Sequence, residues 1–192
     1  MTSNTHTLVK EYNTSDSIQL HLLSSSEESL SSTFLTASDQ AWLEVAGCRL
    51  VGGEVYTRRT KSGELETAFA VIDESNFACS ITRLAKSLPA GTYRLIEPEK
   101  CFDTQRLQQL CIVWGEAGYV FNRYKDASGP QALLCVPDSL SFEFLSHWLT
   151  ITASAKDMIN TPAEDMSPSD IEKRCLLWAE DIGAVSSVLV GE

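Results

Sequence analysis

The chain has 192 residues and a formal net charge of −11, from 26 acidic and 15 basic residues. With 43% hydrophobic and 21% charged residues it has the composition of a globular protein, long enough for one domain, or for one domain and a piece of another. Because so acidic a surface repels phosphate groups, nucleic acid and anionic membranes are disfavoured as partners.

The cysteine pattern indicates a reducing compartment. The six cysteines show no CxxC or similar spacing that would indicate a metal site, and most have apolar neighbours, as Cys135 does between Leu134 and Val136. We therefore expect buried, reduced thiols and a cytoplasmic protein. No run of apolar residues approaches the ~18 of a membrane helix.

Strands alternate with helices through most of the chain. Apolar residues recur at every second position from Ile18 to Leu22, which indicates a strand. Gly63 lies in the turn of a hairpin expected within residues 52–73. Two more strands are expected at 92–96 and 132–137, and helices at 38–46, 76–88 and 104–121. The pattern predicts an α/β fold with a mixed β-sheet flanked by helices.

From Ser139 a single long helix is expected. Its apolar residues recur at intervals of three and four, the spacing of one helix face. They are Leu140, Phe144, Trp148, Ile151, Ala155 and Met158. Pro162 ends this helix, because a proline disfavours the helical conformation of the residue before it, Thr161.

A second helix is expected to begin at Ser167. Pro168 suits the first helical position, and Asp170 stands where a capping box has its acidic residue. The helix should run to Gly183, and a strand-like tail should follow at 185–190.

These elements divide the chain into three parts. They are an α/β domain at residues 1–138, a linking helix with its joint at 139–166, and the start of a second domain at 167–192. The last part has a helix and a strand-like tail without further strands, so it has the form of a βαβ unit that is begun and not finished.

Three segments of the second half carry distinctive motifs. They are LPAGTYRL at 88–95, WGEAGYVFNRYK at 114–125 and DMINTPAEDMSPSDIE at 157–172. In this order they resemble the leucyl aminopeptidase (cytosol aminopeptidase) family, in its shorter bacterial branch; residues 1–87 share only the layout of that family. The resemblance implies structural roles for the motif positions Tyr93, Arg94, Arg123, Tyr124, Lys125, Asn160, Thr161, Pro162 and Asp165.

In that family a macro-like α/β N-terminal domain is joined by a linking helix to a catalytic domain that removes N-terminal residues from peptides. The resemblance implies a cytoplasmic, hexameric metallopeptidase with two divalent metals, manganese or zinc. The family's metal ligands and catalytic lysine lie beyond residue 192, so no catalytic residue and no metal ligand is expected in this chain. We expect an N-terminal fragment of the enzyme, with no cofactor and no activity on its own.

The segment NTPAEDM looks like the family's metal-binding motif, NTDAEGR, but it differs at the positions of the aspartate ligand and the catalytic arginine. Pro162 has no carboxylate, and Met166 stands in place of the arginine. Glu164 is therefore expected to be a solvated surface acid. Structural or surface roles are also expected for the histidines, which lack metal-binding spacing: His6, His21 and His147.

Two other readings stay open: a free-standing macro-like ligand-binding module, and a protein-interaction domain with no small ligand. A gene that continues past Glu192 favours the aminopeptidase, and a stop codon there favours the other two. If the chain is an aminopeptidase fragment, Phe121 and Tyr124 should pack against the sheet at the end of the 104–121 helix. Residues 167–192 should pack against a second copy or fold back on the 139–159 helix.

Overall fold

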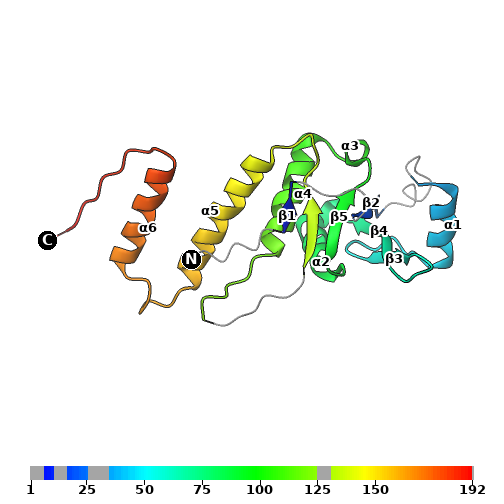
Figure 1. Cartoon of the computed structure of the whole chain (residues 1–192), viewed down its shortest axis with the longest axis horizontal. Coiled ribbons are helices and arrows are strands. Elements are labelled where there is room, and N and C mark those ends of the chain that lie inside the picture. Colours follow the sequence, from blue (N-terminus) through cyan, green and yellow to red (C-terminus); the bar gives the residue numbers. More distant parts are fainter. Residues whose placement is uncertain (1–6, 11–16, 26–34, 125–130, 192) are drawn as a thin grey trace. The chain divides into compact units, whose positions relative to one another are not determined.

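The structure is a computed structural model that describes residues 7–10, 17–25, 35–124 and 131–191. It divides into two compact units, one up to Thr150 and one from Ile151 onwards. Figure 1 shows the elements of both in chain order.

The first unit is built on a six-stranded mixed sheet with the order β1-β6-β5-β2-β4-β3. Neighbouring strands are parallel except for β3 and β4, which form the expected antiparallel hairpin. The strands are β1 (Leu8–Val9), β2 (Ile18–Ser24), β3 (Val55–Arg59), β4 (Leu65–Ile72), β5 (Gly91–Leu95) and β6 (Ala132–Cys135). The predicted α/β class and mixed sheet are therefore confirmed.

The helices follow the sequence pattern closely. Those in the first unit are α1 (Ala37–Val45), the 3-10 helix η2 (Glu74–Asn76), α2 (Phe77–Ser87), α3 (Pro98–Cys101) and α4 (Thr104–Ala117). Helix α5 (Phe142–Asn160) crosses the unit boundary, and α6 (Pro168–Asp181) lies in the second unit. Among the described residues the structure adds β1 and α3 to the expected elements, and it ends α4 four residues before the predicted position at 121.

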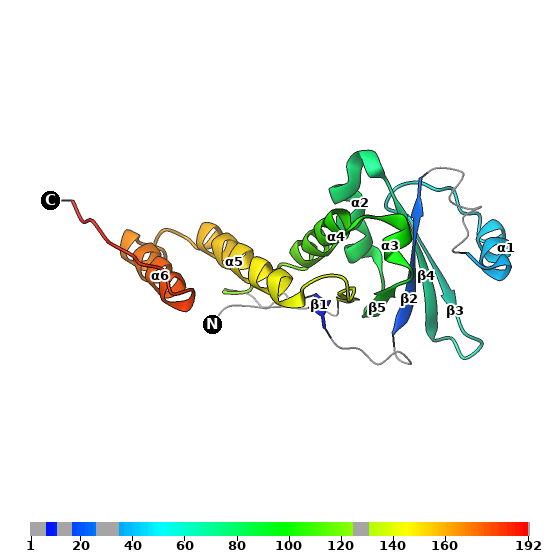
Figure 2. The same ribbon diagram turned by 90° about the horizontal axis from the view of Figure 1, so that it is seen from above.

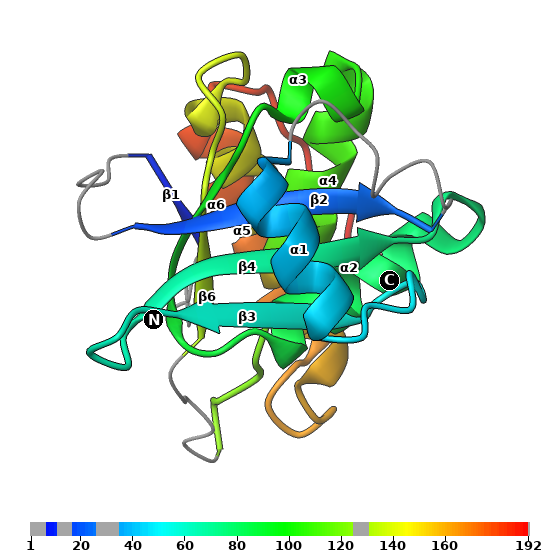
Figure 3. The ribbon, with the colours of Figure 1, turned by 90° about the vertical axis from the view of Figure 1, so that its right-hand side faces the viewer.

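Helices cover both faces of the sheet. Helices α2 and α4 lie on one side of the strands and α1 on the other (Figure 2), and α1 runs across β2, β4 and β3 (Figure 3). Each face has its own apolar cluster; the larger includes Trp114 of α4, and the smaller includes Leu43 of α1. The sheet is thus the middle layer of a three-layer unit.

Strand β4 shows how the sequence specifies this arrangement. Ala68, Ala70 and Ile72 belong to the larger cluster, and Phe69 and Val71 belong to the smaller one. A strand that is buried on both faces needs apolar residues at successive positions, and this is the pattern seen here. The hairpin register places Val55 opposite Ala70.

The buried face of α5 differs from the apolar stripe in the sequence. Leu145 and Leu149 are buried in the larger cluster, whereas Phe144 and Trp148 are 48% and 47% exposed. Gly115 of α4 allows this packing, because a Cβ atom there would lie 2.2 Å from Cδ1 of Leu149. Helix α5 therefore packs into the larger cluster through Leu145 and Leu149, each one position C-terminal to a residue of the predicted stripe.

The second unit begins its helix as the sequence predicts. Ser167 and Asp170 form a capping box, Pro168 is the first helical residue, and α6 has no buried residue. Residues 184–191 form neither helix nor strand, so the predicted strand is not present in this part of the chain. A strand requires a partner for its backbone hydrogen bonds, and an isolated one is not stable in water.

No helix in the described part of the chain has the length and apolar character needed to cross a membrane.

Candidate functional site

The first motif position, Tyr93, is buried in the core on β5. Its hydroxyl donates a hydrogen bond to the carbonyl of Pro89 over 2.7 Å. Burial raises the pKa of Tyr93 to about 12. The side chain is neutral at physiological pH and helps to fix the turn that precedes β5.

Arg94 follows on the same strand and points to the other side of the sheet, since side chains alternate along a strand. It pairs with Gln19 of β2 in the sheet register. Its Nε atom is buried and has no hydrogen-bond partner among the described residues. Burial raises the pKa of the Cys135 thiol to about 11, and the positive charge of Arg94 opposes that rise. Arg94 therefore lies close to the end of β6.

The aromatic pair at 121–124 does not pack as predicted. The rings of Phe121 and Tyr124 contact edge to face with centroids 5.8 Å apart, but Tyr124 is 54% exposed and Phe121 is half-buried. Because α4 ends at Ala117, no helix carries the pair onto the sheet. The Arg123 guanidinium lies 5.5 Å from the Tyr124 ring. Lys125 lies outside the described residues.

The NTPA segment ends α5 and makes a turn. Thr161 is buried, and both its backbone N–H and its hydroxyl donate to the carbonyl of Asp157, over 3.0 and 2.6 Å. The N–H of Asp165 donates to the carbonyl of Pro162 over 2.9 Å. Glu164 is exposed, as the sequence predicts. Asn160 is the last residue of the helix. These contacts stabilise the end of a helix.

No three His, Cys, Asp or Glu side chains among the described residues come together as a metal site. His21 is buried and stacks on Phe69 with ring centroids 5.1 Å apart, and this burial lowers its pKa. His147 is exposed, and His6 lies outside the described residues. The cysteines carry no disulfide in the described part of the chain; Cys79 and Cys175 are exposed, contrary to the expectation of buried thiols.

The carboxyl edge of the parallel strands is acidic. Asp73 follows β4 and caps η2 through its carboxylate, which accepts from the N–H of Ser75 over 2.9 Å. Glu97 follows β5 and pairs with Lys100 over 2.5 Å. Open α/β sheets bind nucleotides at this edge, where phosphates require positive charge or free N–H groups. Acidic side chains at these positions disfavour a nucleotide ligand of the macro type.

A basic side chain near that edge is already occupied. Arg106 of α4 donates to the carboxylate of Glu74 over 2.8 Å, and its guanidinium lies 3.7 Å from the centre of the Phe77 ring. It borders a cavity of about 460 Å³ that is also lined by Asp103. The cation is thus engaged on both sides by the protein itself.

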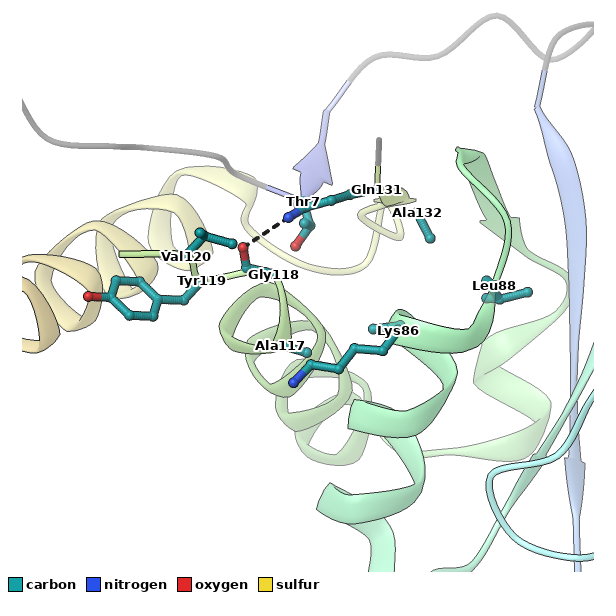
Figure 4. A pocket seen from close by; sticks show the side chains of 10 residues that line it. Thr7, Lys86, Leu88, Ala117, Gly118, Tyr119, Val120, Gln131 and Ala132 are labelled. Carbon is teal, nitrogen blue, oxygen red and sulfur yellow. Dashed lines mark hydrogen bonds between the residues drawn. The ribbon is translucent and has the colours of Figure 1, made fainter. Parts of the chain in front are cut away.

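A second cavity, at the opposite edge of the sheet, is the better candidate for a binding site. It has a volume of about 370 Å³. Figure 4 shows how four segments far apart in sequence meet there. They are Thr7 before β1, residues 85–88 at the end of α2, residues 117–120 at the end of α4, and residues 131–132 at the start of β6. We call this cavity the amino-edge pocket.

Hydrogen bonds between these segments hold the amino-edge pocket open. The Thr7 hydroxyl donates to the Trp114 carbonyl over 3.3 Å, and the Trp114 indole N–H donates to the Ala132 carbonyl over 3.2 Å. The Gln131 amide donates to the Gly118 carbonyl over 3.3 Å (Figure 4). Glycine is required at 118, because a Cβ atom there would lie 2.2 Å from Cγ2 of Thr7.

Lys86 is the one charged residue among the described residues that line the amino-edge pocket. In Figure 4 its side chain runs from the end of α2 towards the end of α4, beside Ala117. It is exposed and makes no ion pair within the described part of the chain. The sequence did not reveal this pocket. Leu88 and residues 117–120 lie in two of the motifs, but only the fold brings them together with Thr7 and Gln131.

The family of the chain is shown by its sequence. The profile of the M17 aminopeptidase N-terminal domain matches residues 18–137, which is more than half of the chain. The chain belongs to this family. A comparison with curated protein sequences gave no significant match.

Solved structures show the same fold. The cytosol aminopeptidase of Coxiella burnetii superposes with a TM-score of 0.77 at 23% identity, over 92% of this chain and 38% of that one. The bottromycin maturation enzyme BotP superposes with a TM-score of 0.63 at 14% identity, over 91% and 40%. Its complex with Mn gives 0.59 at 13%, over 88% and 37%. The chain therefore spans about two fifths of the length of the structures that it matches.

Proposed function

We propose that this chain is the non-catalytic N-terminal domain, with its linking helix, of a cytoplasmic two-metal aminopeptidase that removes N-terminal residues from peptides. The single observation that carries the proposal is the match of residues 18–137 to the M17 aminopeptidase N-terminal domain. The likeness of fold to a cytosol aminopeptidase supports it over 92% of the chain.

In this proposal hydrolysis belongs to a separate catalytic domain that holds two divalent metals, manganese or zinc. When bound there, the metals would supply a hydroxide nucleophile at neutral pH and polarise the peptide carbonyl. The segment NTPAEDM supports this division of roles, since Pro162 supplies no carboxylate and Met166 no positive charge. The part played by residues 7–150 is to form a stable body on which α5 is anchored through Leu145 and Leu149.

An activity assay tests the division of roles. The purified 192-residue chain is incubated with leucine p-nitroanilide and added Mn²⁺ or Zn²⁺. We expect no turnover above the buffer control. Turnover that co-purifies with the chain and is abolished by a chelator would show that the chain itself carries the catalytic groups.

We also propose that apolar side chains near the C-terminal end of the chain take part in assembly. Leu177 of α6 is 59% exposed, and Val185 and Leu189 are exposed in residues 184–191. Exposed apolar patches of this kind mark sites of protein association. Light scattering should therefore show a concentration-dependent mass above that of a monomer for the chain, and a monomer after truncation at Met166. A monomeric full chain at all concentrations would contradict this proposal.

A further inference from the structure

We infer that the amino-edge pocket binds a free α-amino acid in its zwitterionic form, with an aliphatic side chain. The inference rests on three properties of the pocket: a preformed shape, one cation among its described lining residues, and two helix ends that carry partial negative charge. Each property is provided by described residues of the first unit.

The pocket is preformed and has the right size. Its volume of about 370 Å³ lies at the lower end of the ~300–1,000 Å³ typical of ligand pockets. Three segments of its wall are joined by the hydrogen bonds of Thr7, Trp114 and Gln131. A ligand therefore does not have to order these segments, which removes a large part of the usual cost of binding.

Lys86 provides the site for a carboxylate. Its ammonium group has three donors, and no ion pair with a described residue uses them. Its flexible side chain runs beside Ala117 at the pocket (Figure 4). Among the described residues that line the pocket, no acidic side chain competes for the ammonium group. A carboxylate is the natural partner of a single lysine, whereas planar bidentate recognition would require an arginine.

The two helix ends provide the site for an amine. Helix α2 ends at Ser87 and α4 at Ala117, so both present their C-terminal turns to the pocket. A helix C-terminus carries about half a negative charge, and its last carbonyls accept hydrogen bonds from cations. A doubly charged phosphate is disfavoured at such a place. In a zwitterionic amino acid the carboxylate can pair with Lys86 while the neighbouring ammonium group contacts the helix ends.

Part of the remaining wall is apolar, beside the polar side chains of Thr7, Tyr119 and Gln131. The side chains of Ala85, Leu88, Val120 and Ala132 line it. An aliphatic side chain of the ligand can pack against these apolar groups and leave water, which is favourable. A free amino acid is also what an aminopeptidase releases, but binding here does not require that the intact protein hydrolyses peptides.

An NMR titration tests the inference on the 192-residue chain. Amide shifts are followed while L-leucine, sodium acetate, isobutylamine or inorganic phosphate is added in separate experiments. We expect saturable shifts with leucine at the amides of Lys86, Gly118 and Ala132. Acetate and isobutylamine each fill one half of the site, so each should bind at least about tenfold more weakly than leucine does. Phosphate should not bind.

Matched variants locate the ligand. Lys86→Met should weaken leucine binding about tenfold, because it removes one charge-assisted hydrogen bond. Lys61→Met changes another exposed lysine, in the β3–β4 turn, and should have no effect. Ala117→Leu places a larger side chain in the pocket at a helical position and should abolish binding, with the circular dichroism spectrum unchanged. The inference is overturned if leucine gives no saturable shift, if Lys86→Met binds as the unchanged chain does, or if acetate or phosphate binds as tightly as leucine.

Discussion

The body up to residue 150 and the segment at 168–191 begin their helices with the same local signal but bury very different amounts of apolar surface. Thr36 and Asp39 form a capping box at the start of α1, as Ser167 and Asp170 do at the start of α6. Helix α1 then buries Leu43 completely, whereas α6 has no buried residue. Local signals thus determine where a helix begins, and only burial decides whether a region is stable by itself.

Truncating one large side chain in each region should show this difference at its greatest. Trp114 is 1% exposed and Leu177 is 59% exposed. Trp114→Ala removes an aromatic side chain and its hydrogen bond from the core, so we expect a loss of about 3–5 kcal/mol in the free energy of unfolding. Leu177→Ala should change it by less than about 0.5 kcal/mol. Urea unfolding followed by circular dichroism measures both; equal losses would show that α6 is as well packed as α4.

The two capping boxes give a smaller contrast. Asp39 is buried and also accepts a hydrogen bond from the Arg58 guanidinium over 2.5 Å, whereas Asp170 is half-buried. Asp39→Ala removes the cap of α1 and the shorter of the two ion pairs of Arg58, which keeps Glu66 at 3.4 Å, so a loss of about 1–3 kcal/mol is expected in the free energy of unfolding. Asp170→Ala should leave the unfolding of the body unchanged. Two equal effects would contradict the contrast between the regions.

Acid should destabilise the body through His21. Burial lowers the pKa of His21 below its usual value of 6.5, so the unfolded chain binds its proton at a higher pH than the folded chain does. The stabilisation by neutral His21 is therefore complete above pH 6.5 and is lost as the pH falls through its lowered folded-state pKa. His21→Leu should flatten the pH dependence of the urea midpoint in this window. His147→Leu, at an exposed position, should not.

Acid at still lower pH should act through Asp39. Burial works to raise the pKa of Asp39, but hydrogen bonds from Thr36 and Arg58, together with the charge of Arg58, outweigh it and lower the pKa below 3.8. Its contribution to stability is therefore present above pH 3.8 and is lost as the pH falls through the lowered value. His21 and Asp39 therefore affect the free energy of unfolding in different pH ranges.

Much of the fold could be predicted from the sequence, because it follows from local chemistry. The hairpin depends on Gly63, which has a φ of 90°, and the end of α5 depends on Pro162. Long-range pairing could not be predicted. Strand β1 is two residues long, and Leu8 pairs with Leu134, far along the chain. No local pattern identifies a strand this short.

The burial of α5 and the candidate pocket were missed for a related reason. Periodicity identified an apolar stripe through Phe144 and Trp148, but the choice of Leu145 and Leu149 depends on the close approach at Gly115. The amino-edge pocket likewise exists only because Thr7 and the end of α4 are brought together by the sheet. The motif residue Tyr93 is buried in the core, and the sequence did not link it to any site.

One measurement tests most directly the claim that the body is stable without the segment that follows it. The chain truncated after Met166 is unfolded in urea beside the full chain, at a concentration where both are monomeric. Since both apolar clusters lie within residues 8–149, we predict the same free energy of unfolding within about 0.5 kcal/mol. A loss of more than about 2 kcal/mol on truncation would show that the body depends on residues 167–192, and would contradict the account.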